Sequence, residues 1–243
     1  MAGTYELTVE IVGQVLALGT VVVCLLSRCF RRYVFLNLYL LMCTGFSIGN
    51  YYVRSLYGYT SEQYYYFYFM GDAVMMFVAY LVIGSFFDHL FRHSVFCSYI
   101  RPALVFLFLL VVGISGLFIF RGVEHFYSGF VIELEQNMYF VGVVLVFLLW
   151  TSMSYLGTQN RRFVLLVAGT GILFAAHAAN YAVRVLFPSL SALTLAVPPL
   201  AYNFMVGLWL YTFLWVPEEE VAVQPARQVF QRLAPVGAHS LRK

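Results

Sequence analysis

Seven long apolar stretches, separated by short polar gaps, set the pattern of this chain. Each has about 19 to 25 residues, which at about 1.5 Å per residue is long enough to cross a hydrocarbon core of about 30 Å as a helix. We therefore expect an all-α polytopic membrane protein, with one transmembrane domain at 1–216 and a tail at 217–243. The seven helices are expected at about 8–27, 34–53, 64–87, 102–120, 132–156, 163–186 and 192–216.

The basic residues between these stretches predict the direction of each crossing, because cytoplasmic loops of membrane proteins retain Lys and Arg. Eleven of the 14 basic residues fall in alternate gaps or in the tail: Arg28, Arg31, Arg32, Arg92, Arg101, Arg161, Arg162, Arg227, Arg232, Arg242 and Lys243. The other three, Arg54, Arg121 and Arg184, lie at the opposite ends of the stretches. The pattern predicts an external amino terminus and a cytoplasmic carboxyl terminus.

Composition supports a membrane protein and argues against a nucleic-acid-binding one. The chain is 62% hydrophobic and 10% charged, which leaves more apolar surface than a soluble domain of this size can bury. The net charge of +3 is spread over the loop ends, so it is a topology signal and not a binding patch. Tyrosines gather where stretches end, as in 64–68, and such rings favour the headgroup layer.

The first stretch is predicted to be a retained anchor and not a cleaved signal peptide. No cationic segment precedes it, and no A-x-A cleavage site follows it. The four cysteines, Cys24, Cys29, Cys43 and Cys97, map to the cytoplasmic half or to the middle of the membrane, so no disulfide is expected.

The tail begins at Pro217, which cannot continue a helix. Residues 226–233 place Val229, Phe230 and Leu233 on one side, which is compatible with a short helix on the inner leaflet or with a frayed tail. The tail contains no recognisable kinase, cyclase or DNA-binding module. Any signal is therefore expected to leave through another protein.

Polar residues inside the stretches are the candidate functional residues, because such groups are costly in hydrocarbon unless they are paired. With the predicted orientation they lie mainly in the outer half of the membrane. His177, Asn180 and Arg184 are spaced i, i+3 and i+7, which places them on one stripe of one helix. The candidate ligand-binding residues are Asp72, His177, Asn180, Arg184, Glu133, Glu135, Asn137, Asn203, Asn50 and Arg54.

Two interpretations of these residues stay open. They form either a buried network of hydrogen bonds and ion pairs that locks the helices together, or a polar pocket open to the outside. A pocket of this kind would hold a small molecule or a lipid headgroup, with His177, Arg184 and Asp72 as the main contacts. The two interpretations do not exclude each other.

Several kinds of chemistry are absent from the pattern, so no catalytic residue, cofactor or metal ion is expected. Retinal needs a lysine in the last stretch, and the single lysine is Lys243 in the tail. Haem between helices usually needs two axial ligands, and His177 is the single histidine well inside a stretch. His89 and His93 are spaced i and i+4 but lack further ligands. Pro198 and Pro199 are interpreted as a kink in the last stretch.

Small residues in the second stretch favour close helix packing. Gly45 and Gly49 form a G-x-x-x-G step. Packing inside the bundle is the expected role, and homodimerisation through this step is the alternative.

Four short segments carry a resemblance to known proteins: Ser-Glu-Gln-Tyr at 61–64, Ile-Glu-Leu-Glu-Gln at 132–136, Ser-Tyr-Leu-Gly at 154–157 before Arg161 and Arg162, and Ala-Tyr-Asn at 201–203. With these, the chain resembles a group of seven-span bacterial membrane proteins that has no established activity. The resemblance implies a seven-helix architecture and a multi-pass protein of the bacterial inner membrane. In architecture alone, the chain is also similar to the seven-helix sensor regions of bacterial histidine kinases.

Three functions are compatible with these features. The first is a sensor or receptor-like protein that binds its ligand in the outer-half pocket and signals through a protein partner in the membrane or at the cytoplasmic face. The alternative is a structural or accessory subunit of a membrane complex. A transporter would need a polar path to the inner face, where Asn37 and some hydroxyls are the main polar groups. No enzymatic activity and no nucleic-acid partner are expected.

Overall fold

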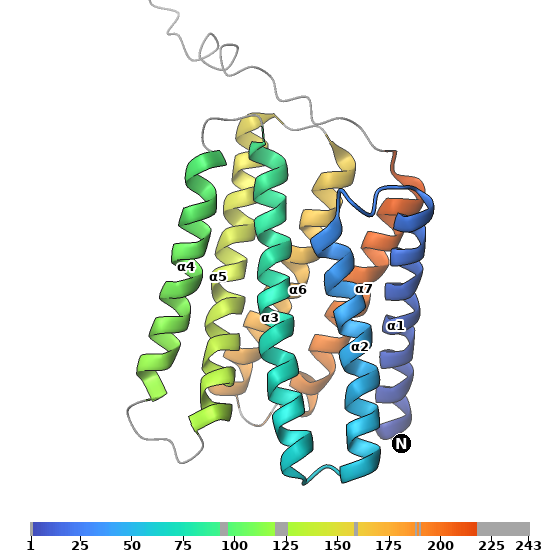
Figure 1. Cartoon of the computed structure of the whole chain (residues 1–243), viewed down its shortest axis with the longest axis vertical. Helices are drawn as coiled ribbons and strands as arrows, with labels where there is room; N and C mark the ends of the chain where they lie inside the picture. The colour runs from blue at the N-terminus through green and yellow to red at the C-terminus, as the bar shows by residue number, and fades with distance from the viewer. Residues whose placement is uncertain are drawn as a thin grey trace, which may run out of the picture.

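Seven α-helices run back and forth along one axis of the molecule (Figure 1). The computed structural model describes residues 2–92, 97–119, 126–157, 160–187, 189 and 191–217. In these residues there is no strand, and all seven helices are long and apolar enough to cross a membrane, which confirms the prediction at this level. The helices are α1 Ala2–Leu26, α2 Val34–Tyr57, α3 Glu62–Phe91, α4 Cys97–Ile119, α5 Phe126–Leu156, α6 Arg161–Leu186 and α7 Ser191–Trp215.

Local chemistry accounts for several helix ends. The Ser61 hydroxyl accepts a hydrogen bond from the backbone N–H of Tyr64 at 3.2 Å, so α3 begins at Glu62. The side chain of Asn160 likewise accepts from the N–H of Phe163 at 2.9 Å and caps α6. Gly58 has φ of +82°, a conformation that favours glycine, and α2 ends immediately before it.

Part of the predicted organisation lies outside the described residues. The tail helix expected at 226–233 is among the residues that the structure does not describe. The same holds for Arg121, for His93 and for the basic residues of the tail.

Six of the helices form a closed ring, and one lies outside it. Neighbours around the ring are α1, α2, α3, α5, α6 and α7, and α7 packs again on α1. Helix α4 packs only on α3 and α5 within the described contacts, and Figure 1 shows it at the edge of the bundle. The first and last helices are therefore direct neighbours, although they are far apart in the sequence.

Large side chains and glycines fill the inside of this ring together. Trp209, Phe163 and Phe174 are almost fully buried. At Gly142 an added Cβ would lie 2.0 Å from the Phe174 ring, so only glycine permits this approach of α5 to α6. Gly49 accommodates the Phe67 ring of α3 in the same way, whereas Gly45 faces open space. Of the predicted G-x-x-x-G step, Gly49 thus serves packing inside the bundle.

The two ends of the bundle differ in charge. The end where α2 begins, here called the arginine end, carries Arg28, Arg31 and Arg32 between α1 and α2. At the same end the buried Arg162 donates from Nε to the backbone oxygen of Val216 at 3.0 Å, which ties the start of α6 to the end of α7. The opposite end, here called the amino-terminal end, contains the start of α1 and the connection between α2 and α3.

Candidate functional site

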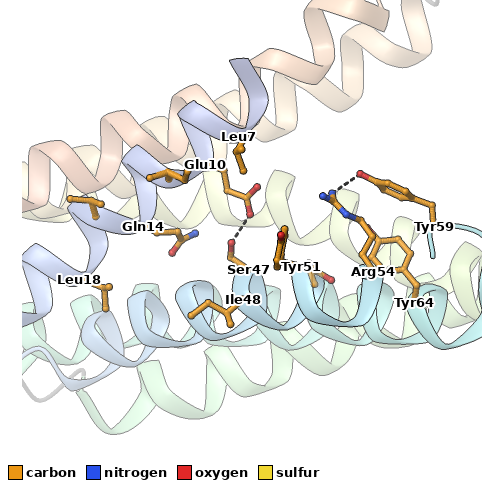
Figure 2. Close-up of a pocket in the computed structure, with 13 residues that line it drawn as sticks. Leu7, Glu10, Gln14, Leu18, Ser47, Ile48, Tyr51, Arg54, Tyr59 and Tyr64 are labelled. Carbon is orange, nitrogen blue, oxygen red and sulfur yellow. Dashed lines mark hydrogen bonds between the residues drawn. The ribbon is translucent and has the colours of Figure 1, made fainter. Parts of the chain in front are cut away.

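A groove of about 570 Å³ lies between α1 and α2 in the half of the bundle nearer the amino-terminal end (Figure 2). Ligand pockets for small molecules usually have about 300–1,000 Å³, so this volume fits an ordinary ligand. The connection between α2 and α3 and the start of α3 close its end. The lining residues are Leu7, Glu10, Ile11, Gln14, Val15, Leu18, Ser47, Ile48, Asn50, Tyr51, Arg54, Tyr59 and Tyr64.

Helical spacing explains why these residues share one cavity. On α1 the polar lining residues Glu10 and Gln14 are four positions apart, so they follow one face of the helix. On α2 the residues Ser47, Asn50 and Arg54 are spaced i, i+3 and i+7, which again is one face. The two polar faces meet across the groove, as Figure 2 shows for Glu10 and Ser47.

The chemistry of the lining changes along the groove. Glu10, Arg54 and three tyrosines lie towards the amino-terminal end, and Val15 and Leu18 lie deeper along α1. At about 1.5 Å per residue, the lining extends about 16 Å along α1, from Leu7 to Leu18. Val15 is 65% exposed and Ile48 is 65% exposed, so the aliphatic part opens sideways to the outside of the bundle. In a membrane this opening faces the lipid chains.

The two charged side chains of the groove have separate partners. The Ser47 hydroxyl donates to Oε1 of Glu10 at 2.5 Å. The Arg54 guanidinium donates from Nη1 to the Tyr59 hydroxyl at 2.5 Å and lies 4.7 Å from the centroid of the same ring. The Tyr51 ring is 5.8 Å away on another side of Arg54. In the part of the chain that the structure describes, no ion pair joins Glu10 to Arg54.

Two amides of the groove wall have unsatisfied acceptors. Oε1 of Gln14 and Oδ1 of Asn50 are buried and have no hydrogen-bond partner. Leaving a buried acceptor without a donor costs about 1–3 kcal/mol, so such atoms usually face a ligand or water. Both oxygens have almost no exposed surface, so a ligand in the groove reaches them only if these side chains rotate.

A second group of polar residues lies inside the bundle, between α3, α5 and α6. We call Asp72, Glu135, Tyr139, His177 and Tyr181 the Glu135 cluster. The Tyr181 hydroxyl donates to Oε2 of Glu135 at 2.6 Å, and Asp72 interacts electrostatically with Glu135. The Tyr139 ring stacks on His177 with centroids 4.2 Å apart and an angle of 18°.

Aromatic rings pack within the Glu135 cluster and beside it. Tyr139 contacts the Phe174 ring at 5.5 Å and the Tyr181 ring at 6.2 Å between centroids. Arg184, at the end of α6, interacts electrostatically with Glu135 from the edge of the cluster and is itself exposed. This arrangement fits a helix-locking network better than an open binding site.

The structure thus distributes the sequence-predicted residues over several places. Asn50 and Arg54 line the groove, whereas Asp72, Glu135, His177 and Arg184 belong to the Glu135 cluster or border it. Glu133 is half-buried, and its spacing of two from Glu135 turns it to another side of α5.

The remaining three candidates are asparagines outside both regions, and two of them make hydrogen bonds between helices. Asn137 donates from Nδ2 to the Ser115 hydroxyl at 3.0 Å, which joins α5 to α4. Asn203 donates from Nδ2 to the backbone oxygen of Val9 at 2.8 Å, which joins α7 to α1. Asn180 is 5% exposed, and its Oδ1 has no hydrogen-bond partner.

Sequence reasoning did not select six of the polar or aromatic residues that line the groove. For the four of them on α1 and α2, helical spacing contains a signal, but using it requires knowing that these two helix faces oppose each other. Tyr59 and Tyr64 give no signal beyond the general tendency of tyrosine to sit at helix ends. The six are Glu10, Gln14, Ser47, Tyr51, Tyr59 and Tyr64.

The described residues contain no group of three or more His, Cys, Asp or Glu side chains that could hold a metal ion. The four cysteines form no disulfide with one another. Cys29 donates from Sγ to the backbone oxygen of Cys24 at 3.6 Å, where the chain turns from α1 towards α2.

No protein-family model, no curated protein and no solved structure matches this chain. The resemblance to seven-span bacterial membrane proteins therefore stays a prediction. The function has to be argued from the geometry of the groove and of the Glu135 cluster.

Proposed function

We propose that this chain is a receptor-like membrane protein that binds an amphiphilic small molecule or a lipid headgroup in the groove between α1 and α2. The observation that supports this most directly is the graded lining of the groove, because both charged groups and all three tyrosines lie towards one end and the deepest lining residues on α1, Val15 and Leu18, are aliphatic. An amphiphile has the same gradient from its head to its chain. Because the aliphatic part opens sideways, such a ligand enters from the bilayer.

The proposal includes an orientation, with the amino-terminal end outside and the arginine end in the cytoplasm of a bacterial inner membrane. Its support is the charge difference between the two ends, since basic residues concentrate at the cytoplasmic side. The inner membrane follows from the resemblance noted above. A reporter fusion after residue 217 tests the orientation, and activity of a periplasm-specific reporter there would contradict it.

A signalling role then requires a second protein, which binds in the membrane or at the arginine end. We do not propose an enzymatic activity. Transport is less well supported, because the lining of the groove ends at Leu18 on α1 and Ser47 on α2, well before the arginine end.

The second candidate function is a structural or accessory subunit of a membrane complex. The Glu135 cluster favours it, since polar groups covered by aromatic rings lock helices without any ligand. Stoichiometric co-purification with a larger complex from native membranes would support this role.

Filling the groove tests the proposed function. Val15→Trp and Ser47→Trp place a large ring in opposite walls, and Val22→Trp is the matched control, because Val22 is also exposed on α1, at 51%, but lies outside the lining. Native mass spectrometry and melting curves in detergent, with a defined mixture of phosphatidylethanolamine and phosphatidylglycerol, report binding. We expect lipid adducts and lipid-induced stabilisation for the natural protein and the control, and their loss in both groove variants.

Equal lipid binding by the two groove variants and the control would show that the groove is not the binding site. A monodisperse elution profile of each variant in size-exclusion chromatography ensures that lost binding is not lost folding.

A further inference from the structure

The polar part of the groove carries one negative and one positive side chain on different helices, each held by its own partner. We propose that the groove selects a zwitterionic phospholipid whose headgroup carries a primary ammonium, with the phosphate on Arg54 and the ammonium at Glu10. This rests on the proposed function and specifies its ligand.

Arg54 is positioned as an anion site. Its guanidinium uses Nη1 for the Tyr59 hydroxyl, and the rings of Tyr59 and Tyr51 hold its plane in place. The remaining N–H groups of a guanidinium match two phosphate oxygens at once, which is the usual way that arginine binds phosphate. Arg54 lies in the last turn of α2, and the end of a spanning helix is where headgroups are expected.

Glu10 is positioned as a cation site. Its carboxylate accepts one hydrogen bond from Ser47, and two carboxylate oxygens can accept several more. Glu10 lies within the apolar span that begins at Leu7, where an acidic group is costly without a cationic partner. Arg54 does not supply that partner, because it donates to the Tyr59 hydroxyl and lies against the rings of Tyr59 and Tyr51.

The carboxylate of Glu10 distinguishes a primary ammonium from other headgroups. The amides of Gln14 and Asn50 also belong to the groove wall, and their oxygens accept no hydrogen bond but have almost no exposed surface. A primary ammonium has three N–H donors and no acceptor, so it can bind Glu10 and, once these side chains rotate, the amide oxygens as well. A quaternary ammonium has no N–H to donate, and a purely anionic headgroup would face Glu10 with like charge.

The aliphatic lining then takes the first part of an acyl chain. Glu10 is level with Ser47 and lies between Arg54 and this lining, so the headgroup folds back from Arg54 and its ammonium lies beside the start of the chain. Ile11, Val15, Leu18 and Ile48 are all exposed towards the outside of the bundle, so the chain continues from the groove into the bilayer. The volume of about 570 Å³ accommodates a headgroup and the beginning of a chain but not a whole phospholipid.

Headgroup selectivity tests the proposal. Native mass spectrometry of the full chain in detergent compares phosphatidylethanolamine, phosphatidylcholine and phosphatidylglycerol with matched acyl chains. We expect phosphatidylethanolamine to bind about tenfold more tightly than the other two, since its ammonium donates charge-assisted hydrogen bonds to Glu10.

Single substitutions assign the two charges. Glu10→Gln is expected to abolish the preference for phosphatidylethanolamine over phosphatidylglycerol, whereas Arg54→Gln weakens the binding of all three lipids. Glu62→Gln is the matched control, because Glu62 is exposed at the start of α3 and does not line the groove. Gln14→Leu removes an acceptor without removing a charge, and it is expected to reduce the same preference for phosphatidylethanolamine. This second variant keeps the test usable if Glu10→Gln does not fold.

The outcomes separate this inference from the proposed function. Loss of all lipid binding in Val15→Trp, together with an unchanged headgroup preference in Glu10→Gln and Gln14→Leu, would overturn the selectivity and leave the groove as the binding site. Tighter binding of phosphatidylglycerol than of phosphatidylethanolamine by the natural protein would also overturn it. Unchanged lipid binding in Val15→Trp and Ser47→Trp would instead contradict the proposed function.

Discussion

The groove and the Glu135 cluster contain similar residues but are built in opposite ways. Both place a carboxyl group and tyrosines near an arginine in the half of the bundle nearer the amino-terminal end, with Arg54 in the groove and Arg184 at the edge of the cluster. In the cluster, aromatic rings from neighbouring helices occupy the space next to the carboxylates, and Tyr181 donates to Glu135. In the groove, Glu10 and Arg54 border an open volume, and two amide oxygens lack donors.

The difference shows that polarity within an apolar helix is not by itself a sign of binding. What separates the two regions is whether the neighbouring helices fill the space beside the polar group. Glycine at position 142 lets Phe174 come close, whereas α1 presents aliphatic side chains that turn outwards. We therefore expect substitutions in the cluster to affect folding and substitutions in the groove to affect binding.

The largest effect is expected from Gly142→Leu. A Cβ at this position would lie 2.0 Å from the Phe174 ring, which is buried and cannot move away, so the cost is about 3 kcal/mol or more. Gly45→Leu is the control, because nothing lies within 4 Å of its Cβ position. The melting midpoint in detergent should fall sharply for the first variant and little for the second. Similar midpoints would show that α5 and α6 are not tightly packed.

Tyr181→Phe should have the next largest effect. It removes the donor of the 2.6 Å hydrogen bond to Glu135 and leaves that carboxyl group less well satisfied inside the bundle, at a cost of about 1–2 kcal/mol. Tyr211→Phe, at an exposed position of α7, is the control. A melting midpoint as high as that of the natural protein would mean that the cluster does not lock the helices.

Asn203→Ala tests the contact that closes the ring. Loss of the 2.8 Å hydrogen bond to the backbone oxygen of Val9 should cost about 1 kcal/mol, as is typical of single hydrogen bonds between membrane helices. The lowered stability should appear in a melting curve. Asn203→Asp keeps an oxygen at the site but loses the amide donor, so it should be no more stable than the alanine variant.

The smallest effect on stability is expected from Ser47→Ala in the groove. Ser47 and Glu10 border open volume, so removing their hydrogen bond should change the free energy of unfolding by less than about 0.5 kcal/mol. Thr44→Ala, at a buried position one turn away on α2, should cost more. A large loss of stability in Ser47→Ala would make the groove a structural contact like the cluster.

The seven helices were predictable because membrane thickness imposes a length on every apolar stretch. Helical spacing also predicted that His177, Asn180 and Arg184 share one stripe of α6. In the structure His177 is half-buried and Asn180 is buried, whereas Arg184, near the end of α6, is exposed.

The division of the candidates into two regions was not predictable in the same way. It depends on which helices are neighbours, and apolar stretches of similar length give little information about their order around a ring. The position of α4 outside the ring, against α3 and α5, is one example. Another is Glu10, which becomes a groove residue only because α2 places Ser47 opposite it.

Two adjacent residues of α1, Val9 and Glu10, have contacts on different sides of the helix. Glu10 faces the groove, while the backbone oxygen of Val9 holds the Asn203 amide of α7, and Gly13 leaves room for that amide. A tilt of α1 that widens or narrows the groove therefore either moves α7 with it or breaks the hydrogen bond between Asn203 and Val9. Since α7 runs to the arginine end, where Val216 holds Arg162, a ligand bound beside Glu10 as proposed would be mechanically connected to that end through one helix.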